Sequence, residues 1–75
     1  MSYRRTPNRM IGERVADAIR GNGVDIAVVA RAADMRPSAL NARLEGRGAF
    51  TFEQLVAVGG FLHVRVSDLV KGATT

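Results

Sequence analysis

The 75-residue sequence contains no cysteine, no tryptophan and only one histidine. Without cysteine the chain can form no disulfide, no thiolate metal site and no cysteine nucleophile. No apolar run approaches the roughly 18 residues that a membrane-spanning helix requires. The first ten residues are polar and basic, unlike the apolar segment of a signal peptide. We therefore expect a cytoplasmic protein of a bacterial cell that does not contact a membrane.

Lysine is almost missing as well, because ten arginines accompany Lys71 alone. With seven acidic residues the formal charge is +4. The planar guanidinium group forms paired hydrogen bonds with phosphate and with guanine, so an arginine bias suits a nucleic-acid ligand. The base composition of a GC-rich genome produces the same bias. Composition leaves both explanations open, and the positions of the arginines must separate them.

The small size of the chain limits its chemistry. A mass of 8.1 kDa accommodates one domain and is too small for most catalytic folds with a deep substrate cleft. Hydrophobic residues make up 47% of the chain, enough for a small core, so disorder over most of the length is not expected. The lone His63 is expected to be a polar cap at a helix end. We predict no enzymatic activity, no cofactor, no metal site and no small-molecule ligand.

Apolar residues recur at helical spacing in five short segments, and no segment shows the alternation of a strand. The sequence therefore predicts an all-α bundle. The first helix is expected to have Thr6 as its N-cap and Pro7 at its first position, and to stop at residues 21–23. The last helix is expected to be short, over residues 66–70.

The three central helices have clear boundary signals. Asp25 is a suitable N-cap for a second helix over residues 26–33. Pro37 is suited to open a third helix that runs to Glu45 and stops at Gly46. The fourth helix is expected to begin with a capping box formed by Thr51 and Gln54, with Phe50 packing against Leu55. A Gly59-Gly60 pair inside that helix indicates either a bend or the close approach of another backbone segment.

Residues 25–46 have the organisation of a helix-turn-helix, whose second helix enters the major groove of DNA. With 100° per residue, Leu40 and Leu44 lie on the inner face of the helix over residues 37–45. Ser38, Ala42 and Glu45 then point outward. The exposed face is therefore small and polar, as a groove about 12 Å wide requires. An exposed apolar stripe would instead have favoured a protein partner.

The outer residues of this helix have the chemistry for reading bases. Ser38 can donate or accept a hydrogen bond, Asn41 can pair with adenine, and Ala42 can contact a thymine methyl group. Arg36, directly before the helix, is placed to reach guanine or a phosphate. Phosphate contacts are expected from Arg43 and Arg47.

The segment VARAADMRPSALNARLEG, residues 29–46, resembles the helix-turn-helix of the lambda-repressor/Cro-type family, also called the xenobiotic-response-element family. Residues 11–15 are similar to the first helix of that family, residues 50–62 to its fourth and residues 64–70 to its last. The resemblance covers about residues 10–70, and it rests on the order and spacing of five segments. It implies a compact five-helix lambda-repressor-like bundle that binds double-stranded DNA.

The resemblance also assigns site residues. The base-reading positions of the family fall on Pro37, Ser38 and Asn41, with Arg36 and Ala42 adjacent to them. Phosphate contacts fall near the start of the second helix and in the loop around Arg47. Pro37 has no amide hydrogen, so it cannot donate a hydrogen bond to a base.

Four further positions depart from the family pattern. Ile26 stands where the family often has a glutamine that anchors a phosphate. Asp34 replaces the glycine of the turn, and aspartate tolerates the left-handed conformation needed there. Arg43 occupies a usually apolar position, so its stem must lie along the surface with its charge in water. Glu45 would repel phosphate unless it pairs with a cation such as Arg47.

The chain is expected to divide into a flexible basic arm over residues 1–9, a DNA-binding domain over residues 10–71 and a disordered tail over residues 72–75. The arm carries three arginines and no acid. It either follows the phosphates or the minor groove of DNA, or it is a solvated tail. Its DNA-contacting residues would be Arg4, Arg5 and Arg9.

The sequence thus predicts a transcriptional regulator of phage or bacterial type, a small repressor or Cro-like protein that represses by covering a promoter. Binding as a homodimer to a palindrome and binding as a monomer are both compatible with it. Self-association would use the last helix, through Val64, Val66, Leu69 and Val70. The alternative is a protein-interaction module, such as an antitoxin-like or anti-activator partner, that uses the last helix and the surface at Gly59-Gly60.

Overall fold

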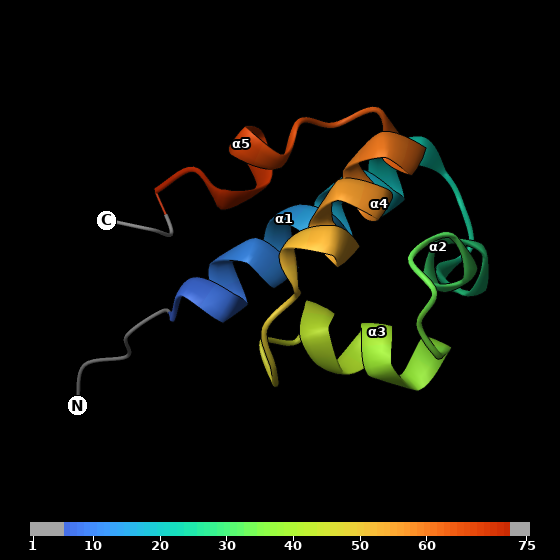
Figure 1. Cartoon of the computed structure of the whole chain (residues 1–75), viewed down its shortest axis with the longest axis horizontal. Coiled ribbons are helices and arrows are strands. Elements are labelled where there is room, and N and C mark those ends of the chain that lie inside the picture. The colour runs from blue at the N-terminus through green and yellow to red at the C-terminus, as the bar shows by residue number, and fades with distance from the viewer. Residues whose placement is uncertain (1–5, 73–75) are drawn as a thin grey trace.

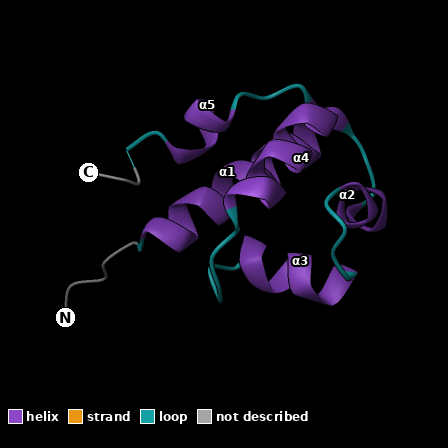
Figure 2. Cartoon of the chain, in the orientation of Figure 1, coloured by secondary structure: helices purple, strands orange, loops and turns teal. Residues whose placement is uncertain are grey.

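Five helices follow one another in the computed structural model, which describes residues 6–72 (Figure 1). No residue in that range lies in a strand (Figure 2). The prediction of an all-α five-helix bundle is therefore confirmed. The helices are α1 (Pro7–Asn22), α2 (Ile26–Ala32), α3 (Pro37–Leu44), α4 (Phe52–Leu62) and α5 (Val66–Val70).

Side-chain caps begin three of these helices where the sequence predicted them. The Thr6 hydroxyl accepts a hydrogen bond from the Arg9 amide at 3.2 Å. The Asp25 carboxylate accepts one from the amide of Ala27 at 3.4 Å. Thr51 and Gln54 form the complete capping box, with bonds of 2.9 and 3.1 Å. Each cap pairs an amide that the helix itself leaves without a partner.

The ends of α2 and α3 differ slightly from the prediction. Ala33 and Glu45 were expected to be the last helical residues, but each is the C-cap that follows its helix. The boundary shifts by one residue because the cap amide bonds to several carbonyls of the last turn at once. His63 caps the end of α4 in the left-handed conformation, at φ 61°, as a polar cap was expected to do.

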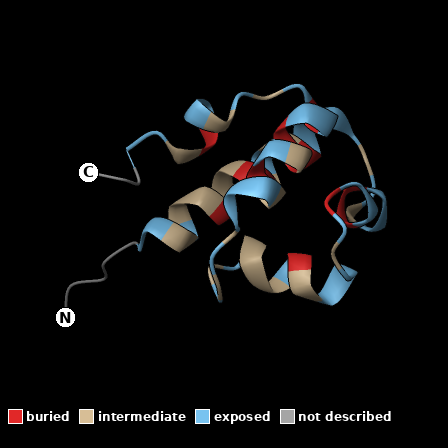
Figure 3. Cartoon of the chain, in the orientation of Figure 1, coloured by how far each residue is buried: buried red, intermediate tan, exposed pale blue. Residues whose placement is uncertain are grey.

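The core lies where α1, α2, α3 and α4 meet, and α5 contributes one side chain to it (Figure 3). Its members are almost completely removed from water, which is the main source of stability for a domain of this size. Leu44 and Ile11 pack against its edge. The buried core residues are Val15, Ile19, Val29, Ala30, Ala33, Leu40, Leu55, Val58, Leu62 and Leu69.

Two glycines allow backbone segments to touch. A β-carbon on Gly12 would lie 2.5 Å from the carbonyl oxygen of Arg43 and 2.6 Å from that of Leu44, so α1 contacts the end of α3 directly. A β-carbon on Gly59 would lie 2.5 Å from the carbonyl oxygen of Val64. Close approach of another backbone segment therefore explains the buried glycine of the Gly59-Gly60 pair.

Three of the residues assigned to the arm belong to a helix. Because α1 begins at Pro7, residues 7–9 belong to its first turn and not to an arm. Arg9 lies on that helix and forms an ion pair with Glu13 across one turn, at 3.5 Å. Two other arm residues assigned to DNA, Arg4 and Arg5, lie outside the described residues, as do residues 73–75 of the predicted tail.

The predicted self-association surface on α5 needs a larger correction. Leu69 is only 2% exposed and belongs to the core, so it is unavailable to a second copy of the chain. The other three residues of that surface, Val64, Val66 and Val70, pack against the same core and are partly buried. The apolar side chains of the last helix are therefore used to close the bundle.

No helix within residues 6–72 is long and apolar enough to span a membrane.

Candidate nucleic-acid interface

The turn between α2 and α3 sets the angle of the unit that the sequence identified as a helix-turn-helix. Asp34 adopts the left-handed conformation at φ 56°, as expected for the residue that replaces the glycine of the turn. The amide of Met35 then donates to the carbonyl oxygen of Ala30 at 2.8 Å. Arg36 is extended, so Pro37 can start the next helix. Hydrogen bonds and backbone conformation together hold the start of α3 in place.

The outer face of α3 has the small, polar character that the sequence predicted. Leu40 is fully buried and Leu44 packs against the core, so these side chains hold the helix to the bundle. Ser38 and Asn41 are exposed, whereas Ala42 is half-buried. The large apolar side chains that are exposed within residues 6–72 all lie on α2 or α4. The exposed surface of α3 is therefore free of bulky apolar groups.

The N-terminal end of α3 is open to an anion. Pro37 occupies its first turn, and no side chain caps it. The amides of the first turn of a helix have no partner within the helix, and they carry the positive end of the helix dipole. A phosphate group close to this end would be bound favourably.

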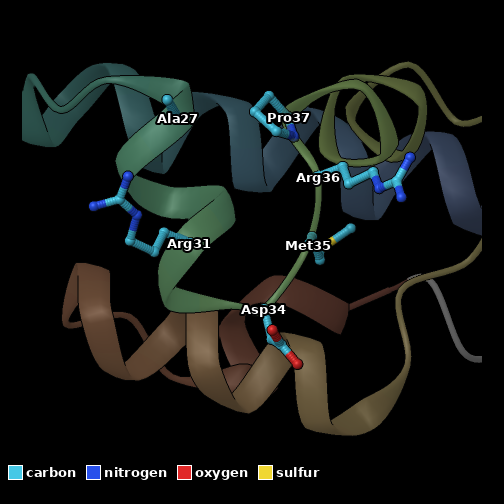
Figure 4. A pocket seen from close by; sticks show the side chains of 6 residues that line it. All are labelled: Ala27, Arg31, Asp34, Met35, Arg36 and Pro37. Atoms are coloured by element: carbon cyan, nitrogen blue, oxygen red, sulfur yellow. The ribbon is translucent and has the colours of Figure 1, made fainter.

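A hollow of about 490 Å³ lies between α2, the turn that follows it and the start of α3. Figure 4 shows Arg31 and Arg36 extending to opposite sides of it. Both arginines are exposed, and neither guanidinium group makes a hydrogen bond or an ion pair with any part of residues 6–72. The hollow is lined by Ala27, Arg31, Asp34, Met35, Arg36 and Pro37.

The arginines on α1, unlike Arg31 and Arg36, form side-chain bonds within the protein. Arg9 pairs with Glu13, and Arg20 pairs with Asp17. Arg14 donates from Nη1 to carbonyl oxygens at the end of α5, including those of residues 69 and 71. These groups have lost part of their attraction for an external anion.

Arg43 was predicted to contact phosphate, but its guanidinium is used inside the fold. Its Nε donates to the carbonyl oxygen of Ala49 at 2.8 Å, and its Nη1 donates to that of Ala39 at 3.2 Å. The residue is half-buried, and these bonds use the charge that was expected to remain in water. Arg43 therefore joins α3 to the loop that follows it.

Arg47 and Glu45 form the ion pair that the sequence suggested. Nε and Nη2 of Arg47 both donate to Oε1 of Glu45, at 2.9 and 2.7 Å. The two side chains are 66% and 62% exposed. The predicted phosphate ligand in this loop is therefore already paired with a carboxylate.

Arg31 was not among the residues predicted from the sequence to contact DNA. A signal was present, because the buried residues Val29, Ala30 and Ala33 mark the inner side of α2. Ala27 and Arg31 are one turn apart and lie on another side of the helix, which faces the start of α3. Ile26, which stands where the family often has a phosphate-anchoring glutamine, is partly buried against the core.

Comparisons with known proteins give one clear likeness. No family model matches the sequence, and no curated protein matches it. The crystal structure of the clp gene regulator ClgR from Corynebacterium glutamicum is similar to this structure with a TM-score of 0.83. The match covers 89% of this chain and 71% of that one at 24% sequence identity. The two chains therefore share the same helical fold.

Proposed function

We propose that this protein binds double-stranded DNA in a sequence-specific manner and regulates transcription by inserting α3 into the major groove. The observation that carries the proposal is the pair of unpartnered arginines, Arg31 and Arg36, on either side of the turn between α2 and α3. They lie beside the open N-terminal end of α3, where an anion is also favoured. The likeness to the clp gene regulator ClgR supports the same proposal.

Each exposed residue near the start of α3 has a proposed role. Arg36 contacts guanine or a phosphate, and Arg31 contacts a phosphate. Ser38 bonds to a base edge or a phosphate, and Asn41 pairs with adenine. Ala42 contacts a thymine methyl group, while Pro37 sets the start of the helix.

We infer that the regulator acts as a small Cro-like repressor by covering a promoter. The domain is 37 Å in its longest dimension, close to one turn of DNA, so one bound copy covers about one half-site. A palindromic operator would bind two copies with their α3 helices about 34 Å apart. We further propose that the protein is of phage origin and belongs to the Cro-type family.

The alternative role as a protein-interaction module has less support. It required an accessible surface at Gly59-Gly60 and along the last helix. Gly60 is exposed, but Gly59 is buried beneath the carbonyl of Val64, and α5 closes the core. The small polar face of α3 also favours DNA over a protein partner.

Binding should depend steeply on salt if phosphates are contacted. A duplex selected from a random pool, labelled for fluorescence anisotropy, provides the measurement. The logarithm of affinity should fall with the logarithm of salt concentration, with a slope of about −0.9 per phosphate contacted. Affinity that does not change between low and moderate salt would contradict the proposed function.

Replacing Arg36 should weaken binding and relax base preference. Arg36→Ala should cost about 1–3 kcal/mol if the side chain reads guanine, and discrimination at one base pair should be lost. Arg20→Ala is the matched control, because Arg20 is an exposed arginine already paired with Asp17 on α1. Equal losses for the two variants would show that only total charge matters.

A further inference from the structure

The backbone at the end of α3 holds Glu45 and Arg47 on either side of a left-handed glycine. Gly46 has φ 83°, and the Arg47 amide donates to the carbonyl oxygen of Ala42 at 2.8 Å. A β-carbon on Gly46 would lie 3.0 Å from the Cα of Arg9, so α1 packs closely against this turn. The relative positions of the two charged residues are therefore set by the fold.

In this contact the second carboxylate oxygen of Glu45 receives no hydrogen bond from Arg47, and the charges of the two side chains cancel. Both donating nitrogens of Arg47 bond to Oε1 of Glu45, at 2.9 and 2.7 Å. The pair is about two-thirds exposed, and exposed ion pairs are individually weak. Glu45 therefore restrains Arg47 without locking it, and a nearby phosphate would have to compete with the carboxylate for the same donors.

This competition matters because the surrounding unit has little excess charge. Residues 25–48 contain four arginines and three acidic residues, a net charge of +1. Releasing one arginine would therefore change the electrostatic attraction of this unit substantially. An arginine that contacts only phosphate contributes equally to binding of every sequence.

We propose that Glu45 is an internal competitor with DNA for Arg47, and that it lowers the affinity of the protein for all sequences and flattens the salt dependence. This inference rests on the proposed DNA-binding function. Glu45 acts through Arg47 as a positioning residue and does not read bases. The carboxylate also repels the phosphates that approach the end of α3.

Removing the negative charge should strengthen binding. Glu45→Gln should raise affinity for a selected duplex and for a random duplex by the same factor, about two- to fivefold at low salt. The salt slope should become steeper by about 0.9, the value for one additional phosphate contact. Base preference should not change. Anisotropy titrations at several salt concentrations provide both quantities.

Asp17→Asn is the matched control. Asp17 pairs with Arg20 on α1, outside residues 25–48, so the variant also breaks an exposed acid–arginine pair and removes one negative charge. Its affinity and salt slope should remain close to those of the unmodified protein. If it matches Glu45→Gln, net charge alone explains the effect and the inference is overturned.

Arg47→Gln, introduced into both backgrounds, identifies the partner. It should reduce affinity less than twofold when Glu45 is present, and it should abolish the gain when Glu45 has been replaced by glutamine. Equal losses in both backgrounds would show that the two residues act independently. Thermal unfolding followed by circular dichroism checks that each variant is folded.

The outcomes separate the two proposals. If the unmodified protein binds no DNA, the proposed function fails. If it binds with a normal salt slope but Glu45→Gln changes neither affinity nor slope, only the competition fails. A change in base preference in Glu45→Gln would instead assign Glu45 a contact with cytosine.

Discussion

The arginines of residues 6–72 differ in whether their guanidinium groups are bonded within the protein. Arg14 and Arg43 donate to main-chain carbonyls, so each links its own helix to another segment. Arg31, Arg36 and Arg65 make no such bonds within the described part of the chain. Only the first two of these three line the hollow between α2 and α3. The overall arginine bias is therefore not equivalent to a DNA-facing surface.

Arg31 should contribute to affinity without contributing to base choice. Arg31→Ala is expected to weaken binding of every sequence by a similar factor and to reduce the salt slope by about 1, because it removes a phosphate contact. Anisotropy titrations with matched and mismatched duplexes measure both effects. Arg65→Ala is the control, since Arg65 is another unpartnered arginine that lies outside residues 25–48. A loss confined to one duplex sequence would instead make Arg31 a base-reading residue.

At the level of helices, contact between main chains positions α3. The absence of a side chain at Gly12 lets α1 rest on the carbonyls at the end of α3. Leu40 anchors the middle of α3 in the core, and the turn at Asp34 anchors its start. These three features orient the outer face of α3 without using any of its exposed side chains.

Gly12→Ala should therefore destabilise the protein, although alanine is the better helix former. Its β-carbon has to displace main-chain carbonyls, and overpacking of this kind typically costs about 1–3 kcal/mol. Gly21→Ala is the matched control in the same helix, because nothing lies within 4 Å of its β-carbon. Chemical denaturation followed by circular dichroism should show a loss for the first and no loss for the second. Equal stability of the two variants would contradict the close contact between α1 and α3.

For the whole molecule, the use of α5 bears on self-association. Leu69 is buried, and its apolar neighbours Val64, Val66 and Val70 pack against the core. The exposed large apolar residues lie instead on α2 and α4, with Phe52 the most exposed at 69%. A two-fold contact through α5 would therefore compete with the core of the domain.

We accordingly expect the protein to be a monomer in solution at micromolar concentration, with any pairing confined to DNA. Sedimentation equilibrium should give a mass close to 8.1 kDa. A stable dimer would contradict this expectation. The variant Phe52→Ser would then show whether α4 forms the contact, since that residue contributes little to the core and its replacement should leave the fold intact.

The local features of the fold were accessible from the sequence because they depend on neighbouring residues. The N-caps at Thr6 and Asp25 and the capping box at Thr51 were identified from side chains within three positions of the amides they bind. The left-handed turn at Asp34 followed instead from the resemblance to a known helix-turn-helix, which has a glycine at that position. The exposed positions Ser38 and Asn41 followed from the helical repeat alone.

Features that join distant segments were missed or misjudged. Leu69 was assigned to a surface because self-association was expected to use the last helix, but contact with other helices buries it. Arg43 was assigned to phosphate from its place beside the predicted groove-reading helix. Its pairing with the carbonyl of Ala49 could not be predicted, because it depends on how the loop folds back. Arg31 was overlooked because its importance arises from the packing of α2 beside the start of α3.

The sequence by itself determined the five helices, their caps, and the small polar face of the third, because helical periodicity and capping are short-range properties. The tertiary structure alone decided which arginines are available. Hydrogen bonds from a guanidinium to carbonyls far along the chain, as for Arg14 at the end of α5, exist only once the helices have packed. The positive charge of the chain is a matter of composition, but its availability at Arg31 and Arg36 is a consequence of the fold.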